Sequence, residues 1–410
     1  MAGIPQISSV MESSVDAKRH SAPRIRGVGS VPVPLLIVTC LLVALGLLVV
    51  HSAVSTNENY SFSRQLIGVG IGFVAMVLIW RFDYRLLSDM VFLLLVVNVV
   101  LILSPHFPII GVEAKGAQSW IKIGIQLQPG EFAKVTVVLL AASVVARYGG
   151  RLDDPVEYVK SLGIMLIPFF CIMTQPDLGT GLVYIFITGI ALVMGGADWR
   201  FIALTLLAAV VGVLLILGVD ELLKYQTDDG TYEYKILKNY QRNRLTVFLD
   251  PEGDTSGSGY NLQQAQIAIG SGGFFGKGLG NGTQAALNFL PEAPTDFIFC
   301  VLAEELGFLG VLVLLALYGA LILICFGIAR GSGDLFGMLI VMCTVGMWLF
   351  QILENIGMTC GLMPITGIPL PFVSYGSSFM LVNFALLGLV GSVWSHNQPR
   401  GKVGENADTY

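Results

Sequence analysis

The chain has 410 residues, of which 54% are hydrophobic and only 12% are charged, and its formal net charge is −5. A soluble globular protein carries charge on about a quarter of its residues, so this composition excludes a soluble fold and indicates a polytopic membrane protein.

The N-terminal stretch 1–31 is polar and carries four basic residues shortly before the first apolar run. That run, Val33 to Val50, is too long for the apolar region of a signal peptide, and no clean cleavage site follows it, so we expect it to stay as a membrane helix. Residues 1–31 and 397–410 are expected to be cytoplasmic tails, the first of them disordered. The six cysteines show no CxxC or Cys/His spacing, which predicts free thiols and no metal site.

Apolar runs predict ten membrane helices in one domain, residues 32–396, because a span needs about 20 apolar residues. They lie near 33–53, 65–80, 86–103, 131–147, 160–174, 179–196, 200–218, 297–329, 334–357 and 376–396. Pro168 and Pro176 are expected to bend or end the fifth helix. The predicted fold class is an all-α polytopic membrane protein with about ten transmembrane helices and a large extracytoplasmic loop between helices 7 and 8.

Basic residues predict the orientation, because short cytoplasmic loops are enriched in Lys and Arg. They concentrate at the ends of the helices that share a side with the N-terminal cluster, at Arg81, Arg85, Arg147, Arg151, Lys160, Arg200, Arg330, Arg400 and Lys402. Both termini are therefore expected in the cytoplasm, and the loops 104–130, 219–296 and 358–375 on the outer face. The third loop is rich in proline and glycine, and irregular backbone at this depth is tolerated when it is buried or lines a cavity. We expect an outward-facing pocket there.

The segment Asn281 to Gly310 joins the second outer loop to the eighth helix, and Asp296 stands at the junction. A carboxylate at this position is costly unless something uses or satisfies it. It either caps the helix N-terminus or serves as a general base. Glu292 and Glu304 favour the second interpretation, because like charges and partial desolvation make a carboxylate more basic.

Two pairs of polar residues inside predicted membrane helices are further functional candidates because of their position. Glu304 and Glu305 lie two turns inside the eighth helix, and we expect one to face a cavity and the other to pair within the bundle. Gln351 and Glu354 lie one turn apart in the ninth helix.

The segment around Trp120 forms a second polar cluster, with Lys122, Glu131 and Lys134 at the same depth. Trp120 is typical of an interfacial anchor. Pro129 indicates a helix start, so Glu131 and Lys134 can form an ion pair on one face. Alternatively, Lys122 or Lys134 binds a phosphate as a point charge.

The glycine-rich run 270–282 does not fit a nucleotide-binding loop. A Walker A motif requires glycine at 271 and serine or threonine at 278, whereas the chain has Ser271 and Gly278. We interpret the run as a close-packed surface loop whose backbone can approach a headgroup.

Five long polar or glycine- and proline-containing segments remain to be interpreted together. They are YQRNRLTVFLDP (240–251), GSGYNLQQAQIAIGSGGFFGKGLGNGTQ (257–284), NFLPEAPTDFIF (288–299), AEELGF (303–308) and PITGIPLPFVSYGSS (364–378). These segments resemble the SEDS family of bacteria, and they resemble its rod-shape branch more than its division branch. The resemblance spans nearly all of the chain after residue 31. It implies a peptidoglycan glycosyltransferase of the bacterial cytoplasmic (inner) membrane that polymerises lipid II at the outer face during cell elongation. The implied partners are a class B penicillin-binding protein and membrane proteins of the elongation machinery, with no nucleic acid.

The resemblance also maps functional residues. The family's essential aspartate matches Asp296, its loop tryptophan matches Trp120, and its QPxExxK segment includes Glu131 and Lys134. Three positions depart from the family pattern, because Pro294 replaces a histidine, Ser119 a basic residue and Ser377 a glycine. Because of Pro294 and Ser119, the family's detailed contacts with the pyrophosphate are not assigned to this chain.

Glycan growth requires a base for the attacking sugar hydroxyl and cations for the leaving pyrophosphate. Asp296 is the expected base. The expected substrate-binding residues are Trp120, Lys122, Glu131, Lys134, Arg242, Arg244, Glu304, Gln351 and Ser377. Mg²⁺ or Mn²⁺ is a candidate to share the phosphate charge, although no ligand cluster in the sequence indicates one.

Two alternatives remain open at this stage. A lipid II flippase would use the intramembrane acids Asp177, Glu304 and Glu354 and the break at 175–181, but no inverted repeat supports it. A scaffold would only hold a penicillin-binding protein and cytoskeletal partners.

Overall fold

The computed structural model describes residues 32–55, 60–107, 110–114, 117–123, 125–175, 177–226, 232–233, 248, 257–287, 289–290 and 292–396. Eight helices in these segments are long and apolar enough to span a membrane, and the shorter apolar helices Val91–His106 and Leu178–Met194 accompany them. The predicted helical membrane fold with about ten spans is confirmed.

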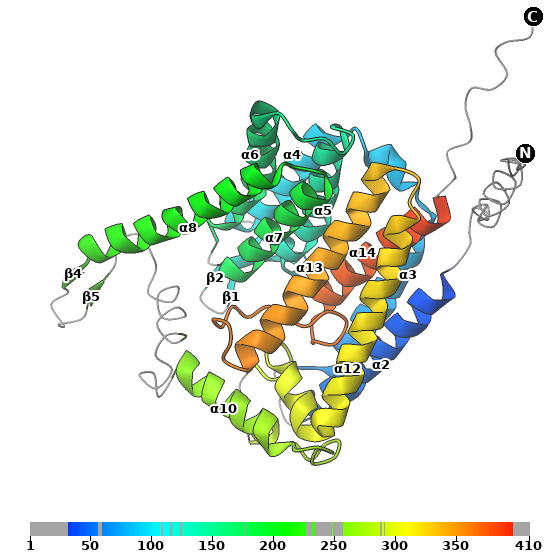
Figure 1. Cartoon of the computed structure of the whole chain (residues 1–410). Coiled ribbons are helices and arrows are strands. Elements are labelled where there is room, and N and C mark those ends of the chain that lie inside the picture. Colours follow the sequence, from blue (N-terminus) through cyan, green and yellow to red (C-terminus); the bar gives the residue numbers. More distant parts are fainter. Residues whose placement is uncertain are drawn as a thin grey trace, which may run out of the picture.

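The long helices are arranged as a bundle with one helix standing apart (Figure 1). They are α2 (Val33–Val54), α3 (Phe62–Arg81), α4 (Val91–Leu103), α5 (Pro129–Ala146), α6 (Pro155–Ile172), α7 (Leu178–Met194), α8 (Trp199–Leu222), α12 (Ile298–Arg330), α13 (Leu335–Thr359) and α14 (Ser377–His396). The shorter helices are η2 (Tyr84–Leu87), η3 (Ser104–His106), α10 (Ser258–Ser271) and α11 (Thr283–Ala286). Helix α8 projects away from the bundle, and its apolar side chains are almost all exposed. Lipid is the medium that can cover such a surface.

The first outer loop contains a small antiparallel sheet that the all-α prediction lacks. Its strands are β1 (Gly111–Ala114), β2 (Ala117–Ile123) and β3 (Ile125–Leu127), in the order β1-β2-β3. In the described residues, β4 (Tyr225–Gln226) pairs with β5 (Tyr232–Glu233) after α8. The β-branched residues Ile121, Ile123 and Ile125 alternate with other side chains, and this alternation in the sequence is typical of a β-strand.

Helices α3 and α14 pack closely because small residues face the contact. A Cβ added to Gly388 would lie 2.7 Å from the Met76 carbonyl oxygen, and one added to Gly391 would lie 2.5 Å from the Trp80 ring. Close backbone approach of this kind is the usual way in which membrane helices associate.

Two helices differ from their predicted course. Helix α6 starts at Pro155 and continues through Pro168 to Ile172, because proline is tolerated in a membrane helix when neighbouring groups satisfy the freed carbonyl. Helix α12 is broken at Gly307, whose φ of 67° and ψ of −165° are not helical. Only glycine adopts this backbone conformation readily.

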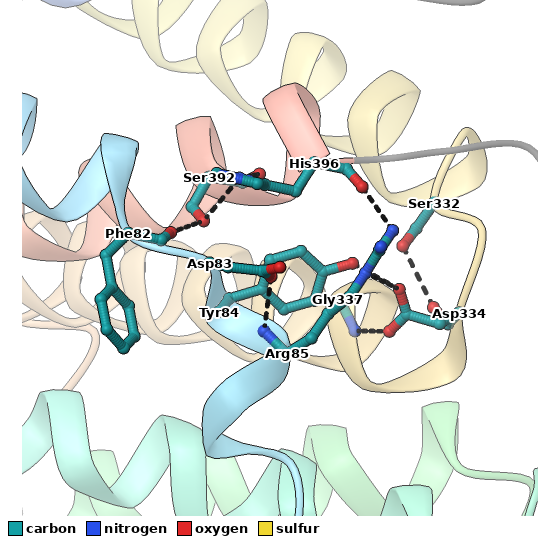
Figure 2. Close-up of polar contacts among 9 residues, drawn as sticks. All are labelled: Phe82, Asp83, Tyr84, Arg85, Ser332, Asp334, Gly337, Ser392 and His396. Carbon is teal, nitrogen blue, oxygen red and sulfur yellow. Dashed lines mark hydrogen bonds and ion pairs between the residues drawn. The ribbon is translucent and has the colours of Figure 1, made fainter. Parts of the chain in front are cut away.

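The bundle end that carries the start of α13 is held by a polar cluster around Asp334 (Figure 2). The Asp334 carboxylate accepts the Gly337 amide at 2.7 Å and the Tyr84 hydroxyl, and Arg85 lies 3.7 Å away. Arg85 also donates to the carbonyl of His396 at the end of α14. Burial, followed by the bond to Asp334, raises the pKa of the Tyr84 hydroxyl, so it stays protonated as a donor. The Asp334 carboxylate thus joins η2 to α13, and Arg85 extends the cluster to α14.

We expect Asp334→Ala to lower the free energy of unfolding by about 2–3 kcal/mol, because the helix cap is lost and buried donors lose their acceptor. The matched variant is Asp198→Ala, since Asp198 caps α8 through the Arg200 amide alone, and its loss should cost about 1 kcal/mol. Unfolding of both variants in the same detergent measures the difference. Equal losses would contradict a joining role for Asp334.

Candidate functional site

Asp296 lies in a series of turns, residues 292–297, that leads directly into α12. Its backbone amide donates to the Glu292 carbonyl at 3.1 Å, and the residue is half-buried. The N-cap of α12 is Phe297, which makes no side-chain cap bond. The N-cap position of α12 therefore belongs to Phe297 and not to Asp296.

The end of α13 holds the backbone on either side of this carboxylate. The Asn355 Nδ2 donates to the carbonyl oxygens of Asp296 and Ile368, each at 2.8 Å. Gly367, beside Ile368, has a φ of +77°, and a Cβ added there would lie 3.0 Å from the Asp296 Oδ2. The backbone of the third outer loop therefore lies directly against the carboxylate, and glycine permits that approach.

Further bonds fasten the third outer loop along residues 292–297. The Tyr375 amide donates to the Pro294 carbonyl at 2.9 Å, and the Ser374 hydroxyl donates to the Thr295 carbonyl at 2.8 Å. The Tyr60 hydroxyl donates to Glu292 at 2.7 Å. Burial, and then this bond to Glu292, raises the pKa of Tyr60. The proline- and glycine-rich segment is thus fixed in place and forms one unit with the Asp296 turn.

Glu131 and Lys134 form the predicted ion pair at the start of α5, with 2.6 Å between Lys134 Nζ and Glu131 Oε1. Lys134 is only 1% exposed, and its ammonium lies 5.6 Å from the centre of the Phe379 ring. Nearby, Asp177 accepts the Gln128 amide at 3.1 Å and the amide of Thr180 at 2.9 Å. Asp177 therefore caps α7.

Gln351 and Glu354 are buried on α13, as expected from their intramembrane position. Glu354 accepts the hydroxyl of Thr366, the residue before Gly367. Neither polar atom of the Gln351 side chain has a hydrogen-bond partner within the described segments. A buried amide without hydrogen-bond partners costs free energy. Gln351 therefore remains a candidate for contact with substrate or water.

Glu304 and Glu305 both hold the loop that follows α10, whereas the sequence placed one of them in a cavity. Glu304 accepts Lys277 Nζ at 2.6 Å, the Thr283 amide at 2.8 Å and the Thr283 hydroxyl at 2.7 Å. The Gly278 amide of the loop donates to the Glu305 carbonyl at 2.9 Å, and the Glu305 carboxylate accepts the hydroxyl of Ser52 on α2. Both residues are buried. These contacts favour the structural interpretation of the two acids.

The remaining predicted site residues lie on other segments. Trp120 and Lys122 are on β2, opposite Val112 and Gln126; Trp120 is half-buried and Lys122 is exposed. Ser377 is exposed at the first position of α14. Arg242 and Arg244 lie outside the described residues.

The family model of the FtsW, RodA and SpoVE cell cycle proteins matches residues 33–399. The chain belongs to this family. As a member of the FtsW/RodA/SpoVE family it is a multi-pass protein of the bacterial inner membrane.

Relatives match the chain over most of its length. The peptidoglycan glycosyltransferase MrdB of Escherichia coli K12 is 36% identical over 375 residues, which cover 89% of this chain and 95% of that protein. The stage V sporulation protein E of Bacillus subtilis is 34% identical over 371 residues, 88% of this chain and 95% of that protein.

Solved structures support the same assignment. A chain from a study of polymerization and crosslinking by a peptidoglycan synthase complex superposes with a TM-score of 0.72 at 29% identity, covering 89% of this chain and 98% of its own. The rod shape determining protein RodA of Thermus thermophilus superposes with a TM-score of 0.64 at 26% identity, covering 90% and 98%.

The expected divalent cation can be compared with the metal-ligating side chains of the described residues. No group of three or more His, Cys, Asp or Glu side chains gathers there as a metal site. The described residues therefore offer no set of ligands for the expected Mg²⁺ or Mn²⁺, and we assign no step of the reaction to a metal.

The sequence did not single out Asn355 and Gly367, which lie against the carbonyl and the carboxylate of Asp296. Asn355 follows Glu354 in an otherwise apolar stretch of α13, and an intramembrane amide is itself a signal of function or of backbone satisfaction. The density of proline and glycine in 358–375 indicated an irregular segment, but it did not indicate that this segment packs against the turn that contains Asp296.

Proposed function

We propose that the protein is a peptidoglycan glycosyltransferase that polymerises lipid II, with Asp296 as the general base. The observation that carries the proposal is a half-buried carboxylate fixed at the end of the bundle between α12, the end of α13 and Gly367. The names of the relatives, peptidoglycan glycosyltransferases among them, support the same activity.

In the proposed step the sugar 4-hydroxyl of one lipid-linked disaccharide attacks the anomeric carbon of another. A carbon–oxygen bond forms there, and the bond from that carbon to undecaprenyl pyrophosphate breaks, so that the pyrophosphate leaves with its electron pair. Asp296 accepts the hydroxyl proton, and a positioned base of this kind typically contributes about 10²–10⁴-fold to the rate.

The leaving pyrophosphate requires a cation in this mechanism. Lys122 is exposed and is the stronger of the two described candidates, because Lys134 is buried in its pair with Glu131. Arg242 and Arg244 remain candidates from the sequence. Trp120, on the same strand as Lys122, would pack against the sugar or the prenyl chain.

The setting of the reaction is part of the proposal. The distribution of basic residues supports an orientation with both termini in the cytoplasm and Asp296 at the outer face. A structural relative from a peptidoglycan synthase complex supports a crosslinking partner, which we propose is a class B penicillin-binding protein of the elongation machinery.

The test is polymerisation of labelled lipid II by the purified full chain in liposomes, with and without the penicillin-binding partner. A ladder of glycan products on a gel supports the proposal. Translocation of the lipid II headgroup with no product under either condition would favour the flippase instead. Partner binding with neither activity would favour the scaffold.

We expect Asn355→Ala to lower kcat by about 10²-fold, because a shift of about 1 Å in a reacting group costs this much. The variant removes the donor shared by the carbonyls of Asp296 and Ile368. The matched variant Thr344→Val removes a buried hydroxyl on the same helix that donates to the Ile340 carbonyl of that helix. KM and kcat are measured separately for both folded proteins. A kcat for Asn355→Ala equal to that of Thr344→Val would disprove the positioning role.

A further inference from the structure

The glycine-rich segment after α10 folds back onto the break in α12. The Phe308 amide donates to the Gly273 carbonyl at 2.9 Å, and the Leu309 amide donates to the Phe274 carbonyl at 3.1 Å. These are amides that the break at Gly307 deprives of helical partners. The Lys277 amide in turn donates to the Glu304 carbonyl at 3.0 Å. The loop is therefore fixed to α12 through its backbone.

This fixed loop presents two large aromatic side chains at the surface. Phe274 is 56% exposed and Phe275 is 77% exposed, and their ring centres lie 4.9 Å apart. The Phe274 ring lies 5.8 Å from that of Phe308, which is itself half exposed. The exposed apolar surface continues along α12 through Leu309, Leu312 and Val313. A continuous apolar surface of this kind indicates an interaction site.

The length of α12 places these rings at one boundary of the membrane. From the break at Gly307 to Arg330, α12 has just enough residues, at about 1.5 Å each, to cross a hydrocarbon core about 30 Å thick. Arg330 marks the opposite boundary, because a charged residue is costly inside the core. Phe308 and the neighbouring rings of Phe274 and Phe275 then lie at the boundary on the Asp296 side.

We propose that Phe274 and Phe275 insert into the lipid leaflet at the Asp296 end of the bundle, which the predicted topology makes the outer leaflet. Apolar side chains presented beside a membrane span bury themselves at the boundary between headgroups and acyl chains. The glycine-rich loop is thus a membrane anchor. Since Lys277 and Thr283 of the same segment bind Glu304, the anchor sets the depth of the first turns of α12, which begin directly after Asp296.

The experiment uses Phe274→Trp and Phe275→Trp in the full chain, reconstituted in vesicles of brominated phosphatidylcholine. Replacing an exposed phenylalanine by tryptophan keeps an aromatic ring and should leave the fold intact, which size-exclusion chromatography checks. Emission of the parent, with its five tryptophans, is subtracted. The matched reporter is Asn281→Trp, because Asn281 is an exposed polar residue of the same loop.

The added emission of both phenylalanine-site reporters is expected to shift to the blue and to be quenched more by bromines near the headgroup than by bromines near the chain end. The Asn281→Trp reporter is expected to be quenched by acrylamide from the water instead. Emission at position 275 that acrylamide quenches and brominated lipid does not would overturn the proposal and assign the aromatic pair to a protein partner. Because the readout requires no glycan synthesis, its failure would leave the proposed activity untouched.

Discussion

Asp296→Asn is expected to reduce lipid II polymerisation by about 10²–10⁴-fold, because the amide has the shape of the carboxylate but cannot accept the hydroxyl proton. The backbone contacts of the residue come from its amide and its carbonyl, and the substitution keeps both. Unfolding temperature and binding of the penicillin-binding partner should therefore stay at the parent values. The measurement is the initial rate of glycan formation at saturating lipid II.

The matched control is Asp198→Asn, the same chemical change at the start of α8. Asp198 caps that helix, and asparagine caps a helix as well as aspartate does, so its rate should equal that of the parent. Full activity in Asp296→Asn would remove this carboxylate from the mechanism. A loss of partner binding together with the rate would point to the scaffold interpretation.

The junction at Asp296 was predictable because the sequence changes there from a polar loop to a long apolar run. The predicted helix starts at 297 and the observed one at Ile298. The ion pair of Glu131 and Lys134 was predictable for a similar reason, since the spacing of three residues after Pro129 fixes their relation within one helix.

The break in α12 could not be predicted, because hydropathy does not record where a backbone amide finds its acceptor. Gly307 lies within an apolar stretch, and the carbonyls that accept the amides after it belong to Gly273 and Phe274, far earlier in the chain. The same limit applies to Asn355, whose amide serves two carbonyls from separate loops. Side-chain pattern indicates which face of a helix is apolar but carries no information on long-range backbone partners.

The buried pair of Glu131 and Lys134 leads to the second large effect. Lys134→Met leaves the Glu131 carboxylate, whose side chain is 7% exposed, without its cation. Breaking a buried pair in this way typically costs about 3–5 kcal/mol, whereas removing both charges is often neutral. We therefore expect Lys134→Met to unfold at a much lower temperature and the double variant Glu131→Leu with Lys134→Met to recover most of the loss.

Helix α6 supplies the matched control, because Glu157 and Lys160 have the same residue types and the same spacing but are largely exposed. Lys160→Met should leave the unfolding temperature close to that of the parent, since exposed pairs contribute little. An unchanged unfolding temperature in Lys134→Met would contradict the structural role. The double variant also separates a structural role of the pair from a role in substrate binding. If the two residues only neutralise each other, the recovered protein polymerises lipid II; if either also binds the substrate, the recovered protein is stable and inactive.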